Sequence, residues 1–502
     1  MGDPEAWTKL GAMHKEGVGV GEDLKWAAEC FRRGADGGDP RAWTNLGVCY
    51  ESGHGVVEDQ KWAVVCYQKG ADGGDPKAWT KLGICHEKGL GAIKDLKQAI
   101  EFHQKGAEME DPEAMFNLGV CHATGKGVVR NQKRSAEHFR NAAEGGYSKA
   151  WFHLGVCYEE GKGVVRDLKR AAECYQKGTE AGDPRAWTNM GVCYEEGLGV
   201  VKELQWTAQC YRFGAEGGDS RAWNRLGLCH QYGRGVTMNL ERAVECYRKG
   251  AGTGDPTVWV SLGLLHSIGH GVEKDLKRAV ECYRKGTEGG DPKSWFYLGV
   301  CHKNGKGVEK DLVMAAQCFQ TAAEGGHPRA WVNLGDCYEK GRGVVKDQKR
   351  AAECYQQGAD KGESKAWLNL GTCYEEGRGV AKDPHQAAEC YWVAAEGGNP
   401  TAWNHLGLCH QFGRGVPVNL ERGVECYRKG ADGGDPKAWL NLGVCHENSC
   451  SDFENNLMQA AECYRKAVEI EGGGREAWIR LGFWCENGLG VVKNLRRAAA
   501  FL

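Results

Sequence analysis

The chain has 502 residues, of which 75 are glycine and only 12 are proline. It also has 18 Trp, 17 Tyr and 12 Phe, and a flexible glycine-rich chain would lack such aromatic residues, so the glycines must punctuate a folded, repetitive structure. The formal net charge of −2 argues against a nucleic-acid partner, which usually requires a basic excess. No apolar run approaches the ~18 residues of a membrane span, and the N-terminus has no signal-peptide pattern.

Tryptophan recurs every 36 residues along almost the whole chain, beginning with Trp7 and Trp43. Met115 occupies the one position that the series skips, and Trp478 follows its predecessor after 39 residues. This period predicts a single array over residues 1–502. Its repeats are 4–39, 40–75, 76–111, 112–147, 148–183, 184–219, 220–255, 256–291, 292–327, 328–363, 364–399, 400–435, 436–474 and an incomplete 475–502.

Residues 39–74 show what one repeat contains. Asp39 is a good helix N-cap, and Pro40 suits the first position of a helix. Gly53 and Gly55 end this first helix and open a loop, after which Asp59 is placed to cap a second helix. A pair of glycines ends the second helix. Because neither short helix can bury its apolar side alone, the repeats must stack into an all-α solenoid of antiparallel helix hairpins.

A glycine lies in the middle of the first helix in every repeat, as Gly47 does in the second. Glycine costs about 0.5–1 kcal/mol relative to alanine at such a position. Its recurrence predicts that two helices approach each other closely there, with the buried aromatic residue of each repeat offsetting the cost.

The first helix has the pattern W-x-x-L-G-x-x-Y, the loop G-x-G-V-x-x-D, as in residues 161–167, and the second helix A-A-E-C-Y. This combination resembles the Sel1-like repeat (SLR) family, a relative of the tetratricopeptide repeats. The resemblance implies a right-handed superhelical solenoid that scaffolds protein complexes, often in signalling or quality control. The thirteenth repeat departs from the pattern, because Asn448, Ser449 and Cys450 replace its loop glycines.

A larger duplication is also visible, because residues 223–256 and 403–436 differ at only 7 of 34 positions and lie 180 residues apart. The copies between them match in the same register. We therefore interpret residues 79–258 and 259–438 as one block copied once, and expect the two blocks to present similar surfaces.

The chain has 24 cysteines, of which 23 fall at two positions of the repeat, one in each helix. These could be disulfides across each hairpin, as in a secreted, cysteine-rich SLR protein with an extracellular role. They could equally be buried thiols, because free cysteine behaves as a small apolar residue. Four of thirteen complete repeats have only one of the two cysteines, as with Cys85 opposite Phe102. This favours thiols, and with them a cytoplasmic location.

No enzyme motif interrupts the 36-residue repeat pattern. Phosphate-loop, nucleophile-elbow and zinc-protease patterns are absent, and no C-x-x-C occurs. Catalysis requires unlike groups that converge at one place, whereas this sequence repeats like groups. We predict a non-enzymatic adaptor with no catalytic residue, cofactor or metal site.

Protein or peptide partners are expected on the face formed by the first helices, which is concave in the tetratricopeptide relatives. Two residues after the tryptophan, a row of amides could bind a peptide backbone: Asn45, Asn117, Asn189, Asn333, Asn369 and Asn441. Two residues before it, a basic row includes Lys149, Arg185 and Arg221, and acids such as Glu51 recur at the helix end. These charges either form two edges that orient a partner or are an ordinary solvated surface.

Overall fold

The computed structural model describes residues 3–448, 453–470, 474–487 and 489, apart from the side chains of residues 453–455. These residues form 27 α-helices and no strand, which confirms the predicted all-α solenoid of helix hairpins. Contacts between residues divide the chain into two units, Met1–Thr253 and Gly254–Leu502. We call them unit 1 and unit 2 and describe each by itself.

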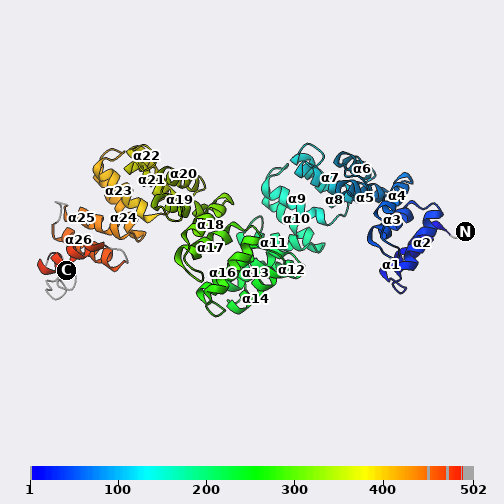
Figure 1. The fold of residues 1–502 in the computed structure, drawn as a ribbon, viewed down its shortest axis with the longest axis horizontal. Helices are drawn as coiled ribbons and strands as arrows, with labels where there is room; N and C mark the ends of the chain where they lie inside the picture. Colours follow the sequence, from blue (N-terminus) through cyan, green and yellow to red (C-terminus); the bar gives the residue numbers. More distant parts are fainter. Residues whose placement is uncertain (1–2, 449–452, 471–473, 488, 490–502) are drawn as a thin grey trace. The chain divides into compact units, whose positions relative to one another are not determined.

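Each repeat is one pair of consecutive helices, an odd-numbered first helix and an even-numbered second helix (Figure 1). Unit 1 contains α1 (Pro4–Glu16), α2 (Leu24–Asp36), α3 (Pro40–Ser52), α4 (Gln60–Asp72), α5 (Pro76–Lys88), α6 (Leu96–Glu108), α7 (Pro112–Thr124), α8 (Gln132–Glu144), α9 (Lys149–Glu160), α10 (Leu168–Glu180), α11 (Pro184–Glu196), α12 (Leu204–Glu216), α13 (Ser220–Tyr232) and α14 (Leu240–Gly252). Unit 2 contains α15 (Thr257–Ile268), α16 (Leu276–Glu288), α17 (Pro292–Asn304), α18 (Leu312–Glu324), α19 (Pro328–Lys340), α20 (Gln348–Asp360), α21 (Ser364–Glu376), α22 (Pro384–Glu396), α23 (Pro400–Phe412), α24 (Leu420–Asp432), α25 (Pro436–Glu447), α26 (Phe453–Glu469) and α27 (Gly474–Asn487).

The helix ends have the caps that the sequence predicts. The Asp39 carboxylate accepts a hydrogen bond from the Arg41 amide (3.0 Å), and Pro40 follows it at the first helical position. Gly53 ends α3 with a left-handed φ of 68°, a conformation that glycine adopts without a steric penalty. The Asp59 carboxylate then caps α4 by accepting from the Trp62 amide at 3.0 Å. The altered loop of the thirteenth repeat, at Ser449 and Cys450, lies outside the described residues.

The mid-helix glycine marks a close approach of the two helices in a hairpin. A Cβ atom on Gly47 would lie 2.6 Å from the Tyr67 ring, a separation that real Cβ atoms essentially never show. Tyr67, in the second helix, is completely buried, whereas Trp43 is half-buried beneath the Lys69 ammonium, 4.1 Å from its ring centre. The predicted close approach is therefore confirmed, and the tyrosine of the second helix is the fully buried aromatic residue.

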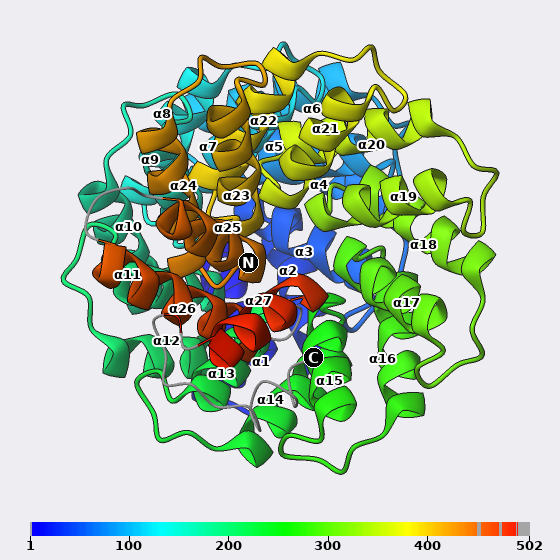
Figure 2. The same ribbon diagram turned by 90° about the vertical axis from the view of Figure 1, so that its left-hand side faces the viewer.

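Neighbouring repeats pack mainly through the second helix of one repeat and the first helix of the next, as α2 does on α3, and a buried polar contact also joins their first helices. The Thr8 hydroxyl donates to the Asp39 cap of the next repeat at 2.6 Å, and both groups are buried. First helices such as α3 and α5 contact each other directly, whereas no two consecutive second helices in the described residues are in comparable contact. Within a unit the first helices therefore lie on the inner side of the curved stack. We call the surface that these first helices present to solvent the first-helix face. Figures 1 and 2 show the side-by-side packing of one hairpin at α21 and α22.

Candidate binding face

A set of polar contacts recurs on the first-helix face and links several repeats to the repeat that follows. In unit 1 the buried Tyr211 hydroxyl donates to Glu195 at 2.6 Å. The other carboxylate oxygen of Glu195 accepts from Arg234 at 2.9 Å, in the loop of the following repeat. Arg225 approaches the same carboxylate at 3.6 Å. One carboxylate thus connects the two helices of its own hairpin with the first helix and loop of the next.

The duplicated block repeats this arrangement within unit 2. Glu375 accepts from the Tyr391 hydroxyl at 2.6 Å and from Arg414 at 3.1 Å. His405 occupies the place of Arg225, 3.9 Å from the carboxylate. Burial and the adjacent carboxylate both raise the pKa of Tyr391, so its hydroxyl keeps its proton and remains a donor.

These contacts give the acidic row a structural role that sequence reasoning missed. The sequence did contain a signal for this role. Where the second helix has a tyrosine, the end of the first helix usually has an acid or an amide 16 residues earlier, as Gln231 accepts from Tyr247 at 2.8 Å. Where phenylalanine replaces the tyrosine, no acceptor is needed. The paired residues there are Phe31 with Lys15, Phe139 with Ala123, and Phe319 with Lys303.

The basic row divides into paired arginines and unpaired lysines. Arg185 binds both oxygens of its own helix cap, Asp183, at 3.2 and 2.9 Å, and Arg221 binds Asp219 in the same way. The Arg185 guanidinium also lies over the Phe152 ring, 4.4 Å from its centre. Among the described residues, by contrast, five exposed lysines of this row have no ion pair: Lys77, Lys149, Lys293, Lys365 and Lys437.

All six predicted asparagines are half-buried on the first-helix face, but their amides differ in what they contact. Asn333 accepts from Lys303 at 2.9 Å and donates to the Arg329 carbonyl at 3.1 Å. Asn441 donates to Asn404 at 2.8 Å. Asn189 contacts the Tyr175 hydroxyl. In Asn117 the amide nitrogen is buried without a hydrogen-bond partner, while no partner side chain is found for Asn45 and Asn369 among the described residues.

A groove of about 540 Å³ lies on this face in unit 1, across α7, α9 and α11. Phe116 lines the groove, and Tyr147 packs on that ring with 4.9 Å between centres. Tyr147 occupies the position where most repeats have the aspartate cap. Lys149, Arg185 and the buried Asp183 form the rim, so two cations face one carboxylate that Arg185 already binds. We call this the Phe116 groove.

Unit 2 contains the counterpart of the Phe116 groove, 180 residues further along the chain. This Phe296 groove has a volume of about 360 Å³. His327 replaces the aspartate cap and stacks on Phe296 with 4.4 Å between ring centres. Arg329 and Glu363 lie 3.7 Å apart in its lining, which also includes Lys303, Lys365 and Asp336. Both grooves therefore combine an aromatic residue with one cation more than the number of acids.

The described cysteines are free thiols: 21 are buried and two, Cys301 and Cys445, are half-buried. Cys450 lies outside the described residues. Burial raises the pKa of the Cys174 thiol to about 12 and that of Cys66 to about 11, so neither forms a thiolate at neutral pH. The thiols line the core clusters beside the buried tyrosines. This favours the thiol interpretation over the secreted, disulfide-bonded alternative.

Burial keeps the core histidine His103 neutral at physiological pH. His103 occupies the tyrosine position of its repeat, is fully buried and has no hydrogen-bond partner on either ring nitrogen. Burial lowers its pKa to about 4.

In the part of the chain that the structure describes, no group of three or more His, Cys, Asp or Glu side chains is arranged to hold a metal ion. None of the helices described there is long and apolar enough to cross a membrane.

The stack of helix hairpins within each unit defines a helical-repeat solenoid. The Sel1 repeat family model matches residues 4–39, 40–75, 76–111, 112–147, 148–183, 184–219, 220–255, 260–291, 294–327, 329–363, 364–399, 402–435, 436–469 and 476–502. The chain therefore belongs to the Sel1 repeat family. Members of this family are generally protein-interaction scaffolds, and their fold is typically non-enzymatic.

A solved structure with the same fold supports this assignment. A protective antigen with an SLR fold from uropathogenic Escherichia coli strains is 29% identical, with a TM-score of 0.58. That match covers 90% of this chain and 96% of the antigen. A Sel1 repeat protein from Oxalobacter formigenes is also 29% identical, covering 61% of this chain and 90% of its own, with a TM-score of 0.47. A search of curated proteins found no match.

Proposed function

We propose that this protein is a non-enzymatic scaffold that binds acidic segments of partner proteins along its first-helix face. The observation that carries the proposal is the recurrence of one groove type, at Phe116 and at Phe296, in the two copies of the duplicated block. In both grooves the polar rim has one cation more than it has acids. An acidic segment with an apolar side chain would match this charge and the aromatic residue.

The exposed lysine of each groove is the group most available to such a partner. Lys149 in the Phe116 groove and Lys365 in the Phe296 groove are exposed, and neither has an ion pair in the described residues. Arg185 supplies a second positive charge whose orientation is fixed by Asp183. We further propose that the asparagine row, with Asn45 and Asn369 the least engaged internally, hydrogen-bonds the backbone of the bound segment.

Selection of a displayed peptide library on the full chain tests this function. Acidic peptides with apolar neighbours should be enriched, and Lys149→Glu together with Lys365→Glu should weaken their binding about tenfold, equivalent to ~1.4 kcal/mol. Both substitutions change exposed side chains and should leave the fold intact. The matched control is Lys77→Glu with Lys437→Glu, because these lysines share the row but line neither groove. Equal losses in both pairs, or no selected peptide, would refute the proposed function.

A further inference from the structure

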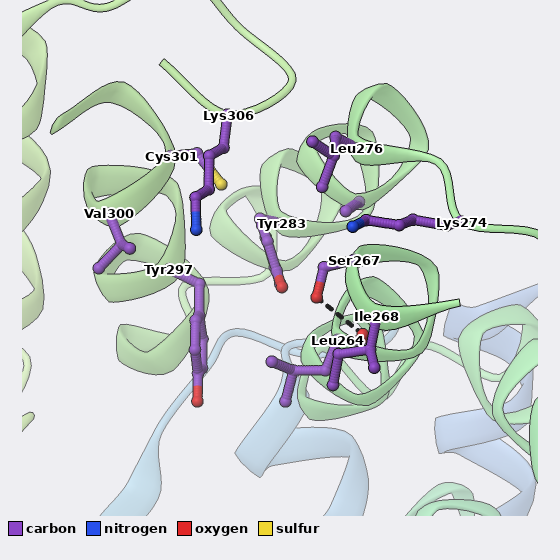
Figure 3. Close-up of a pocket in the computed structure, with 11 residues that line it drawn as sticks. Leu264, Ser267, Ile268, Lys274, Leu276, Tyr283, Tyr297, Val300, Cys301 and Lys306 are labelled. Carbon is purple, nitrogen blue, oxygen red and sulfur yellow. Dashed lines mark hydrogen bonds between the residues drawn. The ribbon is translucent and has the colours of Figure 1, made fainter. Parts of the chain in front are cut away.

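A cavity of about 320 Å³ lies in unit 2 where α15 and α16 meet α17 (Figure 3). Leu264, Ile268 and Val300 contribute apolar walls, and the hydroxyl groups of Tyr283 and Ser267 point into it. It lies one repeat before the Phe296 groove and shares none of its lining residues. The cavity is therefore a separate feature of the first-helix face.

The cavity lies where a carboxylate of the chain itself is found in sister repeats. Position 267 corresponds to Glu195 and Glu375, the acids that accept from a buried tyrosine and from an arginine of the next repeat. Here the residue is Ser267, which has no carboxylate to bind the basic loop residue of the next repeat. Its hydroxyl donates to the Leu264 carbonyl at 2.8 Å and contacts the Tyr283 hydroxyl.

The donors that normally bind this carboxylate are still present. Tyr283 is 2% exposed, and it corresponds to the buried tyrosines of the sister repeats. Lys306 corresponds to the loop residues Arg234 and Arg414. In the first copy of the duplicated block its counterpart, Lys126, pairs with Glu87 at 3.8 Å. No carboxylate within the described residues forms such a pair with Lys306.

A second lysine faces the same space. Figure 3 shows Lys274 and Lys306 extending toward the region beside Tyr283 from opposite sides. Lys274 also has no ion pair among the residues that the structure describes. Tyr297 replaces the usual asparagine and stacks on Tyr283, with ring centres 5.4 Å apart and planes 17° apart. Two cations and a hydroxyl donor are thus gathered around an apolar recess without an acid.

We propose that this cavity binds the glutamate side chain of a partner protein segment, which supplies the carboxylate that Ser267 lacks. Glutamate is favoured because the chain's own sister repeats place a glutamate between a tyrosine and a basic loop residue. The apolar walls would contact its methylene groups, while Tyr283 and Lys306 would donate to its carboxylate. This inference rests on the proposed function and specifies one contact of it.

Ser267→Glu is the decisive variant, because it restores the internal acid. The substituted side chain should accept from Tyr283 and pair with Lys306, so the thermal midpoint of unfolding should rise by about 1–4 °C. Gln411→Glu is the matched control: it adds the same charge where Tyr427 already has an acceptor at 2.5 Å. A midpoint that falls in Ser267→Glu would show that the cavity does not fit a glutamate side chain and would overturn the proposal.

Binding is measured with amidated twelve-residue peptides that have a fixed central glutamate, selected by display on the full chain and then assayed by fluorescence anisotropy. Ser267→Glu should weaken the selected peptides about tenfold, and changing their central glutamate to glutamine should weaken them similarly. Tyr283→Phe should cause a smaller loss, and Gln411→Glu none. Peptides that bind Ser267→Glu as tightly as the wild type would overturn this inference but not the proposed function. Failure to select any peptide would overturn both.

Discussion

Two glycine-to-alanine substitutions in one hairpin should change stability in opposite directions. Gly407 lies in the middle of α23, and a Cβ there would be 2.5 Å from Cε1 and 2.7 Å from Cδ1 of Tyr427. Gly423 lies in α24, where a Cβ would meet only ordinary contacts, the nearest being the Gly407 carbonyl at 3.4 Å. The equivalent of Gly423 is alanine in most other repeats, such as Ala63. The two sites thus differ in the room available for a methyl group, although they lie in the same hairpin.

The magnitudes follow from helix propensity and packing. Alanine is favoured over glycine within a helix by about 1 kcal/mol, and a buried methyl group adds about 0.8 kcal/mol, so Gly423→Ala should stabilise by about 1–2 kcal/mol. Gly407→Ala has the same propensity gain, but it must displace the Tyr427 ring, which is fully buried and bonded to Gln411. Overpacking of a core costs about 1–3 kcal/mol or more, so we expect a net loss of about 1–2 kcal/mol.

Urea unfolding of the full chain, followed by circular dichroism at 222 nm, measures both changes. Unchanged m-values would show that each substitution alters the native state and not the surface exposed on unfolding. The free energies of unfolding should differ by about 2–4 kcal/mol between the two variants. If Gly407→Ala were as stable as Gly423→Ala, the close approach of helix and ring would not explain the recurring glycine.

Two further predictions concern buried titratable groups. Burial lowers the pKa of His103 to about 4 from an unfolded value near 6.5, so the unfolded state binds the proton first. Stability is then complete above about pH 6.5 and decreases by up to ~3 kcal/mol as the pH falls to 4. His103→Phe should flatten that part of the pH–stability curve, whereas an unchanged slope would contradict a buried neutral histidine. Because burial raises the pKa of thiols such as Cys174 to about 12, a thiol reagent at pH 8 should label few cysteines in the native protein. All 24 should react after denaturation without a reductant, and a shortfall there would reveal disulfides.

The local architecture could be predicted from sequence because its determinants lie close together in the chain. Asp39, Pro40 and Gly53 act on their own helix ends, and the 36-residue period follows directly from the tryptophans. The mid-helix glycines also predict a close approach, although the sequence does not identify the Tyr67 ring as the group that meets Gly47. Such short-range signals can be interpreted without knowing how neighbouring repeats are oriented.

The contacts of the binding face were less accessible to sequence reasoning, because they join residues far apart in the chain. Tyr211 and Glu195 are 16 residues apart, and Arg234 is 39 residues from the same acid. Charge rows alone left open whether these charges form edges that orient a partner or an ordinary solvated surface, and they did not show that these carboxylates are bound internally. Comparing the repeats that have tyrosine in the second helix with those that have phenylalanine would have revealed the hydrogen bond between the two helices. The grooves depend on ring packing between repeats, which the row pattern does not contain.

The internal use of the repeated charges changes where a partner is expected. A carboxylate that already accepts from a tyrosine and an arginine must lose those hydrogen bonds before it can bind anything else, and that loss costs free energy. The positions most open to recognition are therefore those where a repeat departs from its neighbours. Tyr147 and His327 replace the aspartate cap beside a groove, and Ser267 replaces the acid beside Tyr283. At each of these places an internal acid is missing while the surrounding cations remain, so these are the places where the proposed acidic segments would bind.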